Sequence, residues 1–167
     1  MAVRSIVSYP DPRLRERAQA VTAFDDALRI LAQDLTDTMT AAPGVGITAP
    51  HIGVSLRLAV IRLDPSDTPR IYVNPRIVWS SSDTIRQTEG SVSMPGVTEE
   101  VERPARVRVT YQDLAGATHE EEAEGFMAVC LQHEIDQLDG IFWIDRLSRL
   151  KRDRAIRRYD KSRRGRA

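Results

Sequence analysis

The stretch FMAVCLQHEIDQLDG, residues 126–140, constrains the fold more than any other part of the chain. It opens with an almost unbroken apolar run, which is typical of a helix buried on most of its circumference. Polar residues follow, and among them His133 and Gln137 are four residues apart, so they lie on one face of the helix with Glu134 beside them. Gly140 is placed to end the helix as a left-handed cap.

The polar part of this helix comes close to the H-E-x-x-H motif of metallohydrolases. In that motif two imidazoles four residues apart hold a cation, and the glutamate between them handles a proton. His133 and Glu134 match the motif, whereas Gln137 stands where the second histidine would be. The pattern therefore indicates hydrolytic chemistry with one metal ligand replaced.

The length and composition favour a single globular domain over residues 1–167. Hydrophobic residues make up 41% and charged residues 29%, as in soluble globular proteins. No apolar run of about 18 residues and no charged-then-apolar leader occurs, so we expect no membrane span and no secretory signal. The single cysteine, Cys130, cannot form an internal disulfide. We expect a cytoplasmic protein in which it is a small buried hydrophobe.

Charge is distributed unevenly, although the formal net charge is zero. Residues 148–167 contain ten Lys or Arg and two Asp, which gives this tail a charge of +8 and leaves −8 on the rest of the chain. An acidic body with a basic tail suggests a separate partner for the tail, and nucleic acid is the first candidate. The alternative is a solvated helix whose charges maintain solubility.

Outside the central helix, hydrophobic periodicity predicts an α+β fold. Residues 24–42 carry Leu28, Leu35 and Met39 at helical spacing, which predicts an amphipathic helix that ends at a Pro-Gly pair. Segments with β-branched or alternating apolar residues predict strands at 57–63, 70–81 and 106–113.

The remaining segments are less regular. Residues 5–21 contain two prolines and predict an extended arm laid across the surface. The pair Asn74-Pro75 predicts that its strand lies at a sheet edge or bends. Residues 86–97 form a polar-apolar run in a glycine-containing segment, and residues 118–125 are either a partner strand or the lead-in to the central helix. The basic tail predicts a C-terminal helix, frayed at its end.

Three stretches, GVGITAPH, EGSVS and HEIDQLDG, resemble the signature motifs of the peptide deformylase family, G-x-G-x-A-A-x-Q, E-G-C-L-S and H-E-x-D-H-L, in order and approximate spacing. The PDPRL arm, the first helix, VNP, IDRLS and the C-terminal helix are also similar, so the resemblance covers nearly the whole chain. It implies antiparallel sheets around an H-E-x-x-H-type helix. It also implies removal of the formyl group from N-formylmethionyl chains by a divalent metal, typically iron.

The resemblance assigns roles to five positions of this chain. Ser91 stands at the position of the cysteine ligand, His133 at that of the first histidine ligand and Gln137 at that of the second. Glu134 is implied as general acid and base, and His51 replaces the glutamine that helps to hold the oxyanion. Because a serine hydroxyl and a glutamine carbonyl are poor ligands for iron or zinc, we expect a divalent metal to bind weakly or not at all in the family's geometry.

Three interpretations follow from these changes. A pseudoenzyme would keep the fold and its cleft as a binding module. A rebuilt site would hold iron or zinc between His51 and His133 with Glu134 or the serine hydroxyl, although His51 is also explained as a neutral hydrogen-bond donor. Metal-free covalent chemistry would use the serine of the second motif as nucleophile, with N–H groups near Gly46 and Val92 as oxyanion hole. We expect deformylase-like or related amide hydrolysis at an altered site, with the pseudoenzyme as the alternative.

The resemblance also implies a substrate pocket and a partner. In the family the methionine side chain enters an apolar pocket beside the metal helix, and Ile47, Val129 and Cys130 are candidates for its wall. The first two motifs add further predicted substrate-binding residues: Gly44, Val45, Glu89 and Gly90. The expected ligand is an N-formylated peptide or a related small amide. The basic tail resembles the helix with which some bacterial members dock at the ribosome, where it would contact RNA phosphates.

Overall fold

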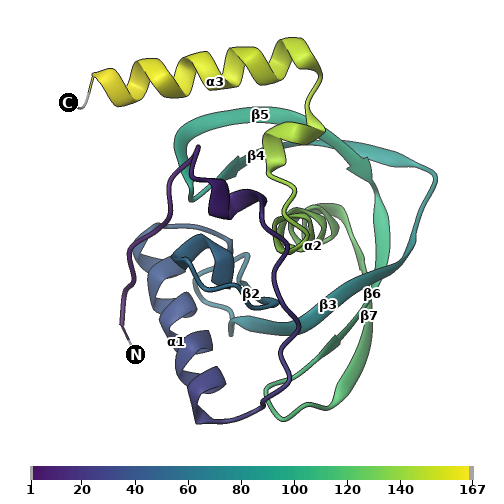
Figure 1. The fold of residues 1–167 in the computed structure, drawn as a ribbon. Helices are drawn as coiled ribbons and strands as arrows, with labels where there is room; N and C mark the ends of the chain where they lie inside the picture. The colour runs from purple at the N-terminus through teal and green to yellow at the C-terminus, as the bar shows by residue number, and fades with distance from the viewer. Residues whose placement is uncertain (1, 166–167) are drawn as a thin grey trace.

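The computed structural model describes residues 2–165, in which two antiparallel sheets surround one buried helix (Figure 1). In chain order the elements are η1 (Pro12–Arg15), α1 (Asp26–Ala41), β1 (Gly46–Thr48), η2 (Ala49–Ile52), β2 (Leu58–Ile61), β3 (Arg70–Ser80), β4 (Thr84–Ser91), β5 (Met94–Pro104), β6 (Arg106–Gln112), β7 (Thr118–Glu124), α2 (Gly125–Leu138), η3 (Trp143–Arg146) and α3 (Arg149–Arg164). The larger sheet has the order β1-β2-β3-β6-β7, and the smaller sheet is the hairpin β4-β5. The predicted α+β class is confirmed.

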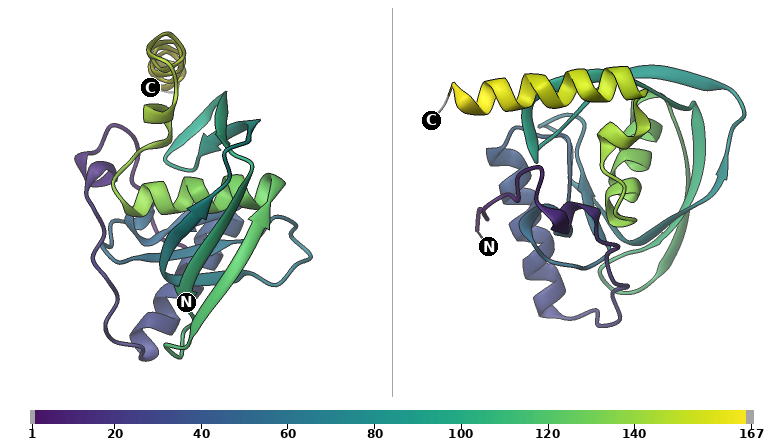
Figure 2. Two further views of the ribbon diagram at one scale, coloured as in Figure 1. Left: turned by 90° about the vertical axis from the view of Figure 1, so that its right-hand side faces the viewer. Right: turned by 45° about the horizontal axis from the view of Figure 1, so that its top comes forward.

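The helix α2 lies between the two sheets, as two further views show (Figure 2). Its side chains Leu131 and Leu138 are at most 1% exposed, and they belong to a core cluster that includes Tyr72 of β3. Gly140 follows the helix with a φ of 79°, and a Cβ there would lie 2.6 Å from the carbonyl oxygen of Arg15. The prediction of a helix buried on most sides and ended by a glycine is confirmed.

The amphipathic helix predicted over residues 24–42 is α1. The side chain of Asp25 caps it by accepting a hydrogen bond from the N–H of Leu28, which satisfies one of the free donors of the first turn. Its apolar stripe, which includes Leu35 and Met39, packs with β1, β2 and β3 in a second core cluster. This helix therefore supports the strand that forms one wall of the cleft described below.

The small sheet was only partly anticipated. The run predicted over residues 86–97 contains the turn of a hairpin, because β4 ends at Ser91 and β5 starts at Met94. Residues 118–125 are resolved as the partner strand β7, which pairs with β6 from Arg106 opposite Glu124 onward. Residues 44–54 after α1, which include the first motif, also contain regular structure, since β1 and η2 fall within them.

The pair Asn74-Pro75 predicted either a strand at a sheet edge or a bent strand, and β3 bends at Asn74. Asn74 has a φ of 50°, and the pairing of β3 with β6 shifts register between Val73 and Arg76. The other option, an edge strand, is wrong because β3 lies between β2 and β6. The bulge accommodates a proline inside a sheet, and the Asn74 side chain bonds both backbone groups of Val21 in the arm.

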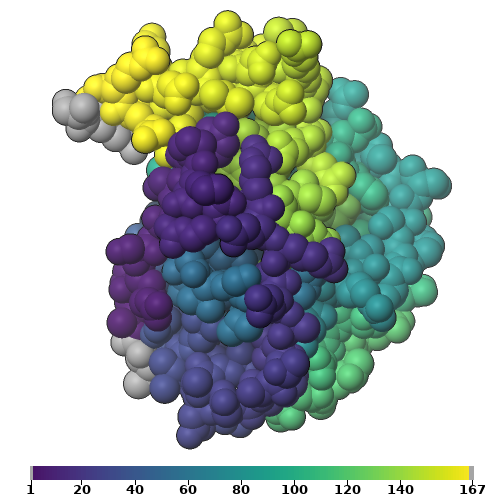
Figure 3. Space-filling view, viewed as in Figure 1, coloured from purple at the N-terminus to yellow at the C-terminus, as the bar shows by residue number. Residues whose placement is uncertain are grey.

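The N-terminal segment is extended and lies across one face of the molecule, as predicted (Figure 3). Its backbone N–H groups at Val7, Tyr9 and Ala18 donate to the carbonyls of His51, Ser93 and Leu138, at 2.7, 2.8 and 2.9 Å. These acceptors lie in η2, at the hairpin turn and at the end of α2. The arm therefore ties together the three segments that carry the signature motifs.

The C-terminal helix α3 packs on the hairpin through Ala155 and Tyr159, and its Arg154 and Arg158 both pair with Glu99 of β5. The predicted fraying falls partly on residues 166–167, outside the described part of the chain. None of the helices in residues 2–165 is both long enough and apolar enough to cross a membrane.

Candidate active site

A cleft of about 570 Å³ opens between α2, the hairpin and the segment that leads into β1. It brings together most of the predicted site residues: Gly44, Val45, Gly46, His51, Glu89, Gly90, Ser91, Val92, Val129, Cys130, His133 and Glu134. The prediction that Ile47 lines the pocket is wrong. Side chains alternate along β1, so Ile47 points into the α1 core while its neighbour Gly46 faces α2.

The carboxylate of Glu89 fixes the orientation of the His133 ring. Its Nδ1 lies 2.8 Å from Oε1 of Glu89, and both side chains are nearly buried. Burial by itself would lower the pKa of His133, but the hydrogen bond to Glu89 and the charges of Glu134 and Glu89 outweigh it and raise this pKa. Because Nδ1 is engaged, Nε2 is the nitrogen left for chemistry in the cleft.

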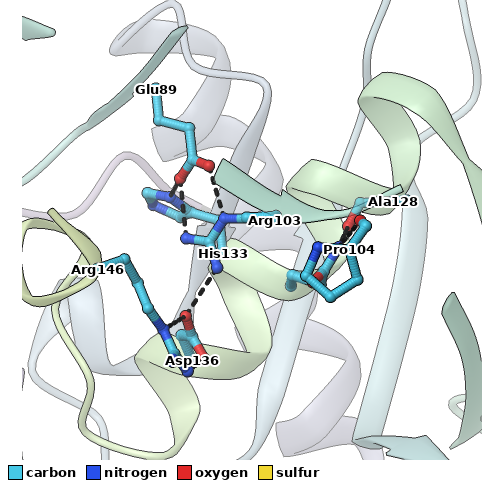
Figure 4. Close-up of polar contacts among 8 residues, drawn as sticks. Glu89, Arg103, Pro104, Ala128, His133, Asp136 and Arg146 are labelled. Carbon is cyan, nitrogen blue, oxygen red and sulfur yellow. Dashed lines mark hydrogen bonds and ion pairs between the residues drawn. The ribbon is translucent and has the colours of Figure 1, made fainter. Parts of the chain in front are cut away.

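Glu89 is in turn held by a buried arginine. Arg103 donates to both carboxylate oxygens of Glu89, at 2.6 and 2.9 Å, and to Asp136 of α2 at 2.9 Å. Arg146 donates to both oxygens of Asp136. Figure 4 shows Glu89 between His133 and Arg103, and Asp136 between Arg103 and Arg146. The carboxylate of Glu89 is therefore occupied in positioning His133, which differs from the substrate-binding role predicted for it.

Glu134 is buried against β1 at a point where only glycine fits. A Cβ on Gly46 would lie 2.6 Å from Oε1 of Glu134, so a larger residue at this position would displace the carboxylate. The need for a glycine at position 46 is therefore explained by this close contact, without the predicted role of its N–H in an oxyanion hole. Oε2 of Glu134 is buried and has no hydrogen-bond partner among the described residues. Desolvation raises the pKa of Glu134 to about 7, although the nearby charge of His133 opposes this. A carboxyl group with such a pKa can accept and donate a proton near neutral pH.

His51 is a neutral hydrogen-bond donor. Its Nδ1 lies 2.9 Å from the backbone N–H of Thr48, and since that N–H can only donate, Nδ1 must be unprotonated. The ring proton is therefore on Nε2, which is buried and has no hydrogen-bond partner among residues 2–165. Desolvation and the charge of His133 lower the pKa of His51 to about 3, so the ring stays neutral. A nitrogen that carries this proton cannot bind a metal, which rules against the site rebuilt around His51.

The two substituted ligand positions do not form a metal site either. The side chain of Gln137 does not line the cleft, and its buried amide donates instead to the carbonyl oxygen of Leu14 in the arm at 2.7 Å. The hydroxyl of Ser91 accepts a hydrogen bond from the N–H of Ser93. Within residues 2–165 no three His, Cys, Asp or Glu side chains are grouped closely enough to hold a metal ion.

The rest of the cleft is mainly apolar. Val97, Val129 and Cys130 line it, and the half-exposed side chains of Val45 and Phe126 lie at its edge, each 39% exposed. Cys130 is buried, as predicted, and this burial raises the pKa of its thiol, so the thiol stays protonated. The cleft therefore offers an apolar pocket next to a few polar groups, the usual composition of a small-ligand site.

Sequence reasoning missed Arg103, Asp136 and Arg146, which position His133, and Thr48, which sets the tautomer of His51. A signal was present for Arg103. It is two residues from Val101, so the alternation of a strand places both on the buried face of β5. A buried arginine requires carboxylate partners, but the sequence alone does not show which carboxylates these are.

Comparisons with known proteins agree on one family. The family model described as polypeptide deformylase matches residues 3–153. A "Peptide deformylase-like" protein of Brucella melitensis is 64% identical over 96% of this chain and 98% of its own length. The crystal structure of a peptide deformylase from Legionella pneumophila has a TM-score of 0.91 and 45% identity, covering 98% of this chain and 96% of that one. A peptide deformylase from Ehrlichia chaffeensis in complex with actinonin has a TM-score of 0.91 and 37% identity, covering 97% and 98%.

Proposed function

Because this chain belongs to the peptide deformylase family, we propose that it hydrolyses the formyl amide of N-formylmethionyl peptides, or a closely related amide, in the cleft beside α2. Family membership supports a hydrolase over the pseudoenzyme alternative. One observation carries the proposal, namely that Glu134 is buried in the cleft with an unpaired oxygen and a pKa near 7. A protein that only binds peptides has no use for such a group, which costs stability whenever it ionises.

The family normally uses iron or another divalent metal, but the donor set of this chain does not fit one. His133 is the one ligand position that keeps its family residue, Gln137 donates its amide to the arm, and the proton on Nε2 of His51 excludes that nitrogen. We therefore propose an altered site in which no step of the reaction depends on a tightly bound metal. A catalyst of this kind would be slower than one that activates water on a cation.

The proposed reaction uses Glu134 as the base. A water molecule beside Oε2 gives its proton to Glu134 as its oxygen attacks the formyl carbon. The formyl oxygen becomes an oxyanion, which the N–H at Nε2 of His51 stabilises, and His133, whose pKa is raised by its hydrogen bond to Glu89, adds positive charge when its ring is protonated. The C–N bond then breaks as Glu134 returns the proton to the leaving nitrogen. The products are formate and a peptide with a free amino group.

Covalent catalysis by Ser91 is less well supported. A serine nucleophile needs a base within hydrogen-bond distance of its hydroxyl. The structure gives the Ser91 hydroxyl no hydrogen bond to His51, His133 or Glu134, and its contact is with the backbone of Ser93. Water activated by Glu134 is the simpler nucleophile.

Two further expectations extend the proposed function. The basic face of α3 suits the phosphates of RNA, so we propose that α3 brings the protein to the ribosome. This setting would be the cytoplasm, where nascent chains emerge. The expected substrate side chain is methionine, since the wall formed by Val97, Val129 and Cys130 is apolar and accommodates an unbranched thioether.

Formate release from a formyl-Met tripeptide tests the proposal, using protein purified without oxygen and assayed with a chelator or with added iron, nickel, cobalt or zinc. We expect slow turnover that survives the chelator and is lost in Glu134→Gln. His51→Ala should lower kcat about 100-fold, whereas His51→Gln, which keeps a donor, should lose less. Turnover that requires a metal would contradict the metal-free step. No turnover under any condition, from folded protein, would contradict the hydrolase. The pair Ser91→Cys with Gln137→His serves as a control that should regain metal dependence.

A further inference from the structure

A second cavity, of about 590 Å³, lies against a different face of α2 from the cleft. Its walls come from the N-terminal arm, β3, β6 and the segment that contains η3. Four arginines from four separate parts of the chain line it: Arg17, Arg57, Arg76 and Arg146. The end of α2 contributes the carboxylates of Asp136 and Asp139. None of these six residues lines the cleft, so the cavity is a separate feature.

The charges around this cavity do not balance. Asp139 pairs with both Arg57, at 2.9 Å, and Arg17, at 3.7 Å. Asp136 pairs with Arg146 and with the buried Arg103, so one carboxylate serves two guanidinium groups. Arg76 forms no ion pair with any described residue. With four arginines and two aspartates in its lining, the cavity carries a surplus of two positive charges.

Part of this positive surface is held rigidly. The side chain of Arg57 is only 11% exposed, and it donates to the carbonyls of Leu138 and Pro75 as well as to Asp139. Arg146 forms two parallel hydrogen bonds to Asp136. Guanidinium groups fixed in this way lose little conformational entropy when an anion binds. Arg17, whose side chain is 74% exposed, and the exposed Arg76 are free to turn toward a ligand.

The floor of the cavity contains the bulge of β3. Asn74 adopts a left-handed conformation there, and the register shift between Val73 and Arg76 interrupts the regular pairing with β6. Bulges and strained residues of this kind are enriched next to functional sites, where they aim a side chain. Here the bulge directly precedes Arg76, the unpaired cation.

We propose that this cavity binds a small molecule that carries a phosphate group. A phosphate monoester has the two negative charges that the lining leaves uncompensated, and arginine forks match its oxygens. The apolar side chains of Ile77, Ile135 and Ile141 form part of the remaining wall, against which an organic part of the ligand can pack. The inference is independent of the proposed hydrolysis.

The test is a titration of the full-length protein with inorganic phosphate and with glycerol phosphate, followed by calorimetry and by NMR of the arginine Nε–H signals. We expect saturable binding of both, and a loss of affinity of about tenfold or more in the double variant Arg17→Ala with Arg76→Ala. Both side chains are exposed, so the variant should keep the fold. The matched control Arg29→Ala with Arg86→Ala removes the same charge at exposed positions of α1 and β4 and should bind phosphate as the wild type does.

Several results would overturn the proposal. Equal loss of affinity in both double variants would mean that phosphate binds through general charge alone. Binding that is not saturable, or is matched by chloride, would mean the same. A short RNA that competes with glycerol phosphate and loses its affinity in the Arg17 and Arg76 variant would place a nucleic acid backbone, rather than a small molecule, in the cavity.

Discussion

At the scale of single residues, two buried polar atoms define the cleft. Nε2 of His51 and Oε2 of Glu134 have no hydrogen-bond partner among the described residues. Buried polar atoms are usually satisfied, because leaving one unpaired costs roughly 1–3 kcal/mol. One of these atoms donates and the other accepts, which is what an amide and an attacking water require. The two unpaired atoms are therefore best explained as hydrogen-bonding groups for the substrate and the attacking water.

Glu134 should lower the stability of the protein at high pH. Its pKa is about 4.5 when unfolded and about 7 in the folded protein, so the folded state binds more protons between these values. The free energy of unfolding must then fall as pH rises from 4.5 through 7. Glu134→Gln cannot ionise, and we expect its stability relative to the wild type to grow by about 2–3 kcal/mol between pH 5 and pH 8.

Urea unfolding of both proteins at several pH values measures this difference. The same substitution should abolish formate release, so stability and activity would move in opposite directions, as is common at active sites. Glu100→Gln, at an exposed position of β5, is a suitable control and should show no such pH dependence. A constant difference between Glu134→Gln and the wild type would show that Glu134 is already ionised in the folded protein at pH 5.

At the scale of elements, a single arginine links the hairpin to α2. Arg103 of β5 bonds Glu89 of β4 and Asp136 of α2, and all three side chains are nearly buried. The hairpin turn is also fixed by the arm through the N–H of Tyr9. His133 therefore keeps its orientation only while the hairpin stays docked on the helix.

Arg103→Met should weaken this docking strongly. The substitution keeps the apolar stem but leaves Glu89 and Asp136 with fewer positive partners in a buried site, which costs about 3–5 kcal/mol. Arg86→Met is the matched control, since Arg86 is an exposed residue of β4 whose contact with Glu100 is at 4.0 Å, and its effect should stay within about 0.5 kcal/mol. Chemical denaturation measures both. Equal effects would show that the buried network adds nothing beyond a surface pair.

The pairing of Arg103 with Glu89 and Asp136 could not be predicted from the sequence, whereas several helices and strands could. Local patterns were sufficient for α1, α2, β6 and the arm, because periodicity and capping residues are properties of neighbouring positions. They were insufficient for the hairpin, because the alternation along β5 places Arg103 on the buried face but does not show that Arg103 bonds Glu89 of β4. Likewise, the family motifs located His51 and Glu134. The tautomer of His51 depends on the backbone of Thr48 in the folded chain.

At the scale of the whole molecule, the uneven charge seen in the sequence becomes a separate surface. The helix α3 lies along the outside of the hairpin (Figure 1). Its residues Arg157, Lys161 and Arg164 are exposed, and their spacing of about one turn places them on one face. Arg154 and Arg158, by contrast, turn toward Glu99 and hold the helix to the body. Arg154 and Arg158 therefore dock α3, and the other, exposed basic face remains for the proposed contact with the ribosome.

This division allows the proposed ribosome contact to be tested without unfolding α3. The variant Arg157→Glu with Arg164→Glu should retain hydrolysis of a free formyl-Met tripeptide but lose binding to ribosomes, measured by co-sedimentation. Wild-type binding should weaken steeply as salt increases, because each phosphate contact releases counterions, and the variant should show a shallower dependence. The control Arg29→Glu with Arg86→Glu changes the net charge equally on other elements and should bind as the wild type does. If both variants bind equally, or if wild-type binding is insensitive to salt, the exposed face of α3 only keeps the protein in solution, and formylated chains must reach the cleft by diffusion.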